Sequence, residues 1–268
     1  MNYKLIAADM DGTLLNSRGV ITEKTRDAIR RVEEKGVTFT VCTGRSIQGV
    51  ERYSDILNPE SPVITYNGAM IVLWKTKEVI YEQRLMPDDA RNILAWGKKF
   101  NTAAVAWSNN RLFAHELNDR VRNYTELSKV EPVLITDEEE IIHSGITKIL
   151  WYDEADKIDH FQEVLSDKLG GGVTFCTSKP TFLEFFDSRV SKAVAMEKIG
   201  EHFGIKKEEM VAIGDGFNDL SMIEYAGMGV AMGNAPEEIR KRANYVTLSN
   251  DDDGVAHFLD KFIRSSDF

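Results

Sequence analysis

The sequence is poor in cysteine, in proline and in positive charge. Of its 268 residues two are cysteine and six are proline, and the formal net charge is −10. Cys42 and Cys176 lie far apart and match no metal-binding spacing, so we expect small buried side chains there. The negative charge argues against nucleic acids and anionic membranes as partners.

Long apolar runs are missing as well. No stretch approaches the roughly 18 residues that a membrane span needs, and no secretory signal precedes the first predicted strand. We therefore expect a cytoplasmic protein. A hydrophobic content of 43% suffices for one large domain or two smaller ones. The sequence leaves the assembly open between a monomer and a homodimer.

Strands and helices alternate in both terminal parts of the chain. Residues 4–8 and 37–42 read as buried strands with a helix between them. Such alternation predicts an α/β, Rossmann-like parallel sheet with helices on its faces. Ligands of that architecture bind beyond the carboxyl ends of the strands, where Asp9, Thr43 and Asn67 are expected.

The middle of the chain has a different pattern of predicted helices and strands. A predicted helix is followed by short β-like pieces, a second helix and two more strands, which is typical of an α+β unit. We therefore predict a core formed by residues 1–83 and 187–268, with residues 84–186 inserted as a separate domain.

A pair of acidic residues follows the first predicted strand, in the segment 9–15 (DMDGTLL). A chain turning at Gly12 can aim the carboxylates of Asp9 and Asp11 at one point. One could then attack an electrophile while the other handles a proton, beside a divalent cation. The pair alone fits a solvated turn equally well.

Two further segments carry less specific signals. The tripeptide Thr43-Gly44-Arg45 follows a strand, where a hydroxyl and backbone N–H groups make a site for phosphate oxygens. Lys192 lies near the start of a predicted helix, where a lysine more often faces water than a substrate.

The most specific later segment is 214–219 (GDGFND), which follows a predicted strand. Acidic and amide side chains in a glycine-rich loop suit a hard cation that prefers oxygen ligands. A turn that caps the next helix would explain Asn218 or Asp219, but it would leave Asp215 unexplained.

In this order the segments resemble the four motifs of the haloacid dehalogenase-like (HAD) hydrolase superfamily. The position of the insertion resembles the type II cap of that superfamily. Residues 63–69 (VITYNGA) and 232–235 (MGNA) further resemble its Cof-type branch, which has a type IIB cap. The resemblance covers essentially the whole chain.

The resemblance implies a catalytic role for each acid. Asp9 would be the nucleophile that forms an aspartyl-phosphate, and Asp11 would act as general acid and then as general base. Mg²⁺ would be held by the Asp9 carboxylate, the Asp11 backbone carbonyl and Asp215. Asn218 and Asp219 would complete or orient that shell.

It also implies how a substrate is held. Thr43, Gly44 and Lys192 would bind the transferring phosphoryl group, and Arg45 and Asn67 could touch the leaving group. The expected activity is that of a phosphatase for small phosphorylated metabolites, most often sugar phosphates. Which metabolite is used, and by which cap residues it is selected, the sequence leaves open.

Other functions share parts of this pattern. A phosphomutase or phosphotransferase would use the same aspartyl-phosphate and pass it to a sugar hydroxyl. A catalytically silent sensor of phosphorylated metabolites is a further alternative. Signalling receiver domains also combine a phosphoacceptor Asp with Thr, Lys and Mg²⁺, but they are less than half this length and lack the insertion.

Overall fold

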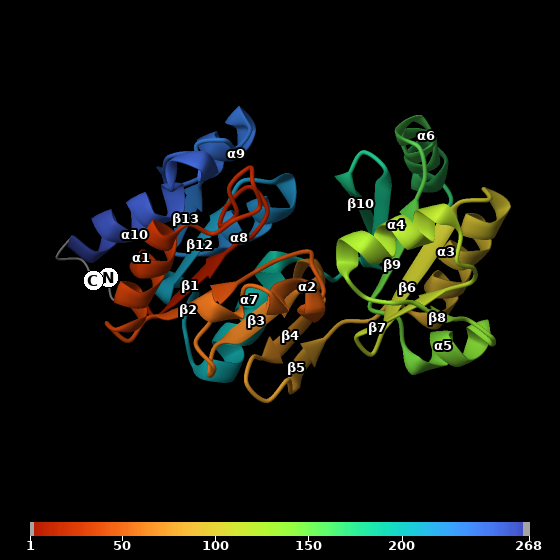
Figure 1. Cartoon of the computed structure of the whole chain (residues 1–268), viewed down its shortest axis with the longest axis horizontal. Coiled ribbons are helices and arrows are strands. Elements are labelled where there is room, and N and C mark those ends of the chain that lie inside the picture. Colours follow the sequence, from red (N-terminus) through yellow and green to blue (C-terminus); the bar gives the residue numbers. More distant parts are fainter. Residues whose placement is uncertain (1–2, 265–268) are drawn as a thin grey trace. The chain divides into compact units, whose positions relative to one another are not determined.

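The computed structural model describes residues 3–264 and divides the chain into two compact units (Figure 1). The core unit comprises Met1–Thr43, Arg52–Tyr81 and Ser191–Phe268, and the inserted unit comprises Gly44–Glu51 and Glu82–Val190. The role of residues 84–186 as a cap stays a prediction.

A parallel sheet forms the centre of the core unit, with the strand order β14-β13-β12-β1-β2. Every residue of β1 is buried, as expected for a strand covered by helices on both faces. The strands are β1 (Leu5–Ala8), β2 (Thr38–Val41), β12 (Met210–Gly214), β13 (Met228–Ala231) and β14 (Tyr245–Val246). The predicted Rossmann-like sheet is confirmed.

Helices cover both faces of this sheet, with α1 and α10 on one side and α7 on the other (Figure 1). α1 begins after its N-cap Thr22, whose side chain accepts a hydrogen bond from the Thr25 N–H. α7 is capped in the same way by Ser191, and α8 packs beside it. The helices are α1 (Glu23–Glu33), α7 (Lys192–Phe203), α8 (Leu220–Tyr225), α9 (Glu237–Arg242) and α10 (Gly254–Arg264).

A small antiparallel sheet extends the core beside β2. It contains β3 (Pro62–Thr65), β4 (Met70–Leu73) and β5 (Val79–Glu82), and β5 spans the boundary between the two units. A parallel bridge between Cys42 and Ile64 joins β3 to the end of β2. The end of β3 therefore lies next to Thr43.

The inserted unit contains a mostly antiparallel sheet with the strand order β10-β11-β9-β6-β7-β8. In its core, Trp151 packs against both Phe161 and Phe185. The elements are α2 (Ile47–Glu51), α3 (Pro87–Lys99), β6 (Ala103–Ser108), β7 (Arg111–Ala114), α4 (Asp119–Ser128), β8 (Val133–Leu134), α5 (Glu138–Ser144), β9 (Lys148–Tyr152), α6 (Ala155–Ser166), β10 (Val173–Lys179) and β11 (Phe182–Asp187).

The two cysteines differ in their burial. Cys42 is buried, whereas Cys176 is half-buried on β10, so a small buried side chain is confirmed for the first and is only partly right for the second. Among the described residues, no helix combines the length and the apolar composition that crossing a bilayer requires.

Candidate active site

Three predicted site residues follow the carboxyl ends of neighbouring core strands. Asp9 follows β1, Thr43 comes two residues after β2, and Asp215 follows β12. Because β1 lies between β2 and β12 in a parallel sheet, these ends share one edge. Lys192 is the first residue of α7 and is brought to the same edge.

Lys192 is almost completely buried, with 1% of its surface exposed. Its Nζ lies 2.6 Å from Asp9 Oδ1 and 2.5 Å from Asp219 Oδ1, and it donates to the Cys42 carbonyl at 2.7 Å. An ammonium has three N–H bonds, and each has an acceptor here. Burial alone would lower the pKa of Lys192, but the two carboxylates raise it, so the lysine stays charged.

Asp219 connects Lys192 to the loop that carries Asp215. Its Oδ2 accepts hydrogen bonds from the backbone N–H groups of Asp215 at 2.9 Å and Gly216 at 2.8 Å. Both oxygens of the buried carboxylate therefore have partners. Asp219 thus positions the loop and orients Lys192, whereas its side chain makes no cap hydrogen bond to the following helix α8.

Asp9 is also buried, with 5% of its surface exposed. Burial and, second, the Asp219 carboxylate raise the pKa of Asp9, Lys192 lowers it, and the net pKa is about 8. Burial is the main cause, and to it is added that two buried carboxylates share the same ammonium. A second cation beside Asp9 would relieve this excess of negative charge.

Asp215 is held by two side chains that we did not predict as site residues. Thr13 Oγ1 donates to Asp215 Oδ1 at 2.8 Å, and Asn234 Nδ2 donates to Asp215 Oδ2 at 3.3 Å. Burial raises the pKa of Asp215 to about 6, while the Thr13 hydrogen bond lowers it. Gly12 has a φ of 82°, and a Cβ at this position would overlap the Asp215 carboxylate. Only glycine therefore fits without strain.

The acidic residues form a cluster that could hold a metal ion. Asp9, Asp215 and Asp219 each offer an oxygen atom within 4.8 Å of the others. When all three are ionised, the Lys192 ammonium compensates one of the three negative charges. An oxygen-only donor set with excess negative charge suits a hard divalent cation.

The other predicted core residues surround this cluster. Asp11 is exposed and lies in the turn after Asp9, where it forms a bridge with Leu15. Thr43 is buried, and its carbonyl accepts a hydrogen bond from the Asn67 N–H at 2.9 Å. Asn67 Oδ1 accepts from Asn218 Nδ2 at 3.1 Å, so Asn67 contacts the 214–219 loop.

Gly44 and Arg45 are the first residues of the inserted unit. Within that unit, Lys148 Nζ donates to the Gly44 carbonyl at 3.4 Å, and Arg45 Nη1 reaches the Gly49 carbonyl at 3.5 Å. Their contacts with phosphate and leaving group stay predictions.

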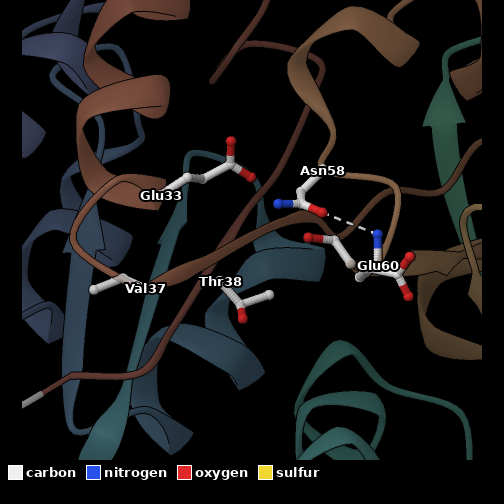
Figure 2. Close-up of a pocket in the computed structure, with 7 residues that line it drawn as sticks. Glu33, Val37, Thr38, Asn58 and Glu60 are labelled. Atoms are coloured by element: carbon white, nitrogen blue, oxygen red, sulfur yellow. Dashed lines mark hydrogen bonds between the residues drawn. The ribbon is translucent and has the colours of Figure 1, made fainter.

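A separate pocket lies at the amino end of β2, where Thr38 begins the strand (Figure 2). Glu33 and Glu60 contribute carboxylates to its wall, and Asn58 Oδ1 accepts from the Glu60 N–H. The strand ends at Val41 on the opposite edge of the sheet. None of the predicted site residues lines this pocket.

Comparison with known proteins places the chain in a family. The model of the haloacid dehalogenase-like hydrolases matches residues 6–259. Bacillus subtilis YxeH, for which a phosphatase activity is proposed, is 35% identical, covering 97% of this chain and 98% of YxeH. The 5-amino-6-(5-phospho-D-ribitylamino)uracil phosphatase YcsE of the same bacterium is 34% identical, covering 96% of this chain and 94% of YcsE.

A solved structure gives the same result for the fold. The HAD subclass IIB sugar phosphatase BT4131 superposes with a TM-score of 0.82 and 26% identity, covering 97% of this chain and 98% of that one. The chain therefore belongs to the haloacid dehalogenase-like hydrolases. Within that family it is a Cof-type phosphatase of subclass IIB, as its motifs predicted.

Proposed function

We propose that the protein is a Mg²⁺-dependent phosphatase that hydrolyses small phosphorylated metabolites, sugar phosphates in particular, through an aspartyl-phosphate at Asp9. The observation that carries the proposal is the buried contact of Lys192 with both Asp9 and Asp219, close to Asp215. This arrangement leaves excess negative charge where a phosphate must bind, and a metal ion would offset it.

The residues present fit Mg²⁺. The Asp9 carboxylate, the Asp11 backbone carbonyl and Asp215 would hold the ion, and Asn218 and Asp219 would orient that set. All of these donors are oxygen atoms, which Mg²⁺ prefers. When bound, Mg²⁺ would neutralise charge on the phosphoryl oxygens and so lower the barrier to attack by an anion.

Asp9 and Asp11 divide the chemistry between them. An Asp9 oxygen attacks phosphorus, the ester P–O bond breaks, and Asp11 donates its proton to the leaving alkoxide. Asp11 then takes a proton from water as that water attacks phosphorus, which breaks the Asp9–phosphate bond and releases inorganic phosphate. The exposure of Asp11 gives it the access to solvent that the second step requires.

Three residues would hold the transferring phosphoryl group. Lys192 supplies a fixed positive charge, the Thr43 hydroxyl donates a hydrogen bond, and the Gly44 N–H donates another. Asp219 supports this role, since its contact helps to keep Lys192 charged in a buried place.

The substrate class rests on the relatives. The names of YcsE and BT4131 describe phosphatases of a phosphorylated ribityl compound and of sugar phosphates. For this chain we propose that residues 84–186 act as the cap that selects the leaving group, with Arg45 and Asn67 contacting it. We further propose that the protein works in the cytoplasm as a monomer or homodimer.

A substrate panel tests the proposal. Phosphate release from phosphorylated sugars, sugar alcohols and sugar acids would be measured with Mg²⁺ and with EDTA, for the wild type and Asp9→Asn. We expect metal-dependent release of phosphate, and we expect Asp9→Asn to abolish it. The control is Asp260→Asn, which changes a carboxylate on α10 that pairs with Arg31 of α1, and it should leave the release intact. Substantial release by Asp9→Asn would refute the role of Asp9. Turnover that requires an added acceptor alcohol would indicate phosphotransfer instead of hydrolysis.

A further inference from the structure

We propose that Asn234 is a positioning residue for the metal site, since it fixes the orientation of the Asp215 carboxylate. Asn250 supports Asn234 from the segment that leads into α10. The inference rests on the proposed function, in which Asp215 is a Mg²⁺ ligand, and it concerns residues of the core unit alone.

The Asn234 side chain joins three segments that are distant in sequence. Its Nδ2 donates to the Gly12 carbonyl at 2.9 Å and to Asp215 Oδ2 at 3.3 Å. Its Oδ1 accepts a hydrogen bond from the Asn250 N–H at 3.0 Å. A carbonyl can only accept and a backbone N–H can only donate, so these two partners fix which end of the amide faces Asp215.

Asn250 extends this connection to the loop after Asp9. Its Nδ2 donates to the Leu15 carbonyl at 2.9 Å, so side chain and backbone of one residue contact both Leu15 and Asn234. The segment that carries Gly12 and Leu15 is thereby bound to the β13–α9 loop directly through Asn234 and to the segment before α10 through Asn250. Movement of Asn234 away from Asp215 would break several hydrogen bonds together.

The consequence for Asp215 is that each of its oxygens receives a hydrogen bond from a different segment. Thr13 donates to Oδ1 and Asn234 donates to Oδ2. A carboxylate oxygen has two lone pairs, so each keeps one for a cation. With both donors in place the carboxylate cannot rotate without losing a bond, and its orientation is set before a metal arrives.

The expected magnitude follows from the quality of each contact. Removing an outer partner of a metal ligand costs roughly 10–100-fold in metal affinity. Asn234 is exposed and its contact with Asp215 is long, so we expect Asn234→Ala to lower the metal affinity about tenfold. Thr13 is buried and its bond is short, so Thr13→Val should cost more, whereas Thr13→Ser keeps the hydroxyl and should retain most of the affinity.

Asn244 offers a matched control. It is exposed like Asn234, and its Oδ1 accepts from the Gly229 N–H at 2.7 Å, near the start of β13 and away from Asp215. Asn244→Ala removes a comparable amide hydrogen bond. We expect it to lower thermal stability without changing metal affinity, which separates positioning from general loss of structure.

The test is a titration of the metal-free full-length protein with Mn²⁺, followed by the paramagnetic resonance signal of the free ion, with Mg²⁺ as competitor. We expect Asn234→Ala to weaken binding about tenfold at a melting temperature no lower than that of Asn244→Ala. Asn250→Ala keeps the backbone N–H that donates to Asn234 Oδ1 but loses the side-chain hydrogen bond to the Leu15 carbonyl. It should therefore weaken Mn²⁺ binding by a smaller factor. It also serves as the informative variant if Asn234→Ala does not fold.

The variant Asp215→Asn distinguishes a failure of the positioning role from a failure of the proposed metal site. If Asp215→Asn abolishes binding while Asn234→Ala and Asn250→Ala bind Mn²⁺ like the wild type, the positioning role is wrong and the metal site stands. If Asp215→Asn also binds normally, Asp215 is not a ligand, and both the proposed site and the inference are overturned. A loss in Asn244→Ala equal to that in Asn234→Ala would likewise overturn the positioning role.

Discussion

Replacing Lys192 with methionine removes the positive charge that lies between Asp9 and Asp219. Methionine has a similar length and can occupy the buried site, so the change is mainly one of charge. The carboxylate oxygens of the cluster lie within 4.8 Å of one another. The two carboxylates repel each other with or without the lysine, so the variant loses the attraction of each carboxylate to the ammonium and leaves both buried without their partner. Removing one partner of a buried ion pair costs roughly 3–5 kcal/mol, and we expect the free energy of unfolding of metal-free Lys192→Met to fall by about that amount when both carboxylates are ionised.

This loss should depend on pH in a definite direction. Lys192 lowers the pKa of Asp9 in the wild type, so its removal raises that pKa further above about 8. Between the unfolded pKa and the raised folded pKa the folded state binds more protons, so stability falls as pH rises. The difference between wild type and Lys192→Met should therefore be larger at pH 9 than at pH 6.

Urea unfolding in EDTA at the two pH values measures this difference, and phosphate release with saturating Mg²⁺ measures catalysis. We expect kcat to fall by about 10²-fold or more, because a fixed charge that stabilises the transition state is lost. Lys198→Met, which changes a lysine paired with Glu201 on the same helix, is the control and should change neither quantity much. A Lys192→Met protein with wild-type stability at pH 9 and wild-type kcat would refute the reasoning.

Three further predictions follow from the same contacts. Asp9→Asn should make the metal-free protein more stable than the wild type at pH 9 in urea unfolding, because it removes a buried carboxylate with a raised pKa; a loss of stability there would contradict the charge assignment. Gly12→Ala should raise the Mg²⁺ concentration for half-maximal activity by about tenfold or more, since its Cβ would displace Asp215; an unchanged value would show that the loop adapts. Neither thiol should react quickly with a disulfide reagent at pH 8, because Cys42 is buried and burial raises the pKa of Cys176 to about 12; rapid release of one equivalent of chromophore would disprove this.

The edge of the sheet at which the site lies was predictable from the sequence, whereas the environment of Lys192 was not. Alternation of strand and helix implies a parallel sheet, and the carboxyl ends of its strands then collect Asp9, Thr43 and Asp215. The helical pattern around Lys192 alone favours an exposed lysine. Its burial depends on the carboxylates of Asp9 and Asp219, which are 183 and 27 residues away in the sequence. The local periodicity of a helix does not indicate such distant partners.

The supports of Asp215 were missed for a similar reason. Thr13 lies 202 residues from Asp215, and Asn234 contacts Gly12 across 222 residues. Both residues belong to segments whose patterns were noted, 9–15 and 232–235, but a pattern does not say which side chain faces which. The helix α4 was missed because it buries little more than Val121 and Tyr124, too few apolar residues to create a visible period.

The central claim is that Asp9 carries the phosphoryl group during turnover. The most direct measurement is rapid acid quenching during turnover of a reactive phosphate monoester, followed by peptide mass spectrometry of the Asp9 segment. We expect the mass of one phosphoryl group on the peptide that contains Asp9, formed and lost at rates compatible with kcat and absent in Asp9→Asn. Phosphate release at full rate with no label on this peptide, or with the label on another residue, would contradict the account.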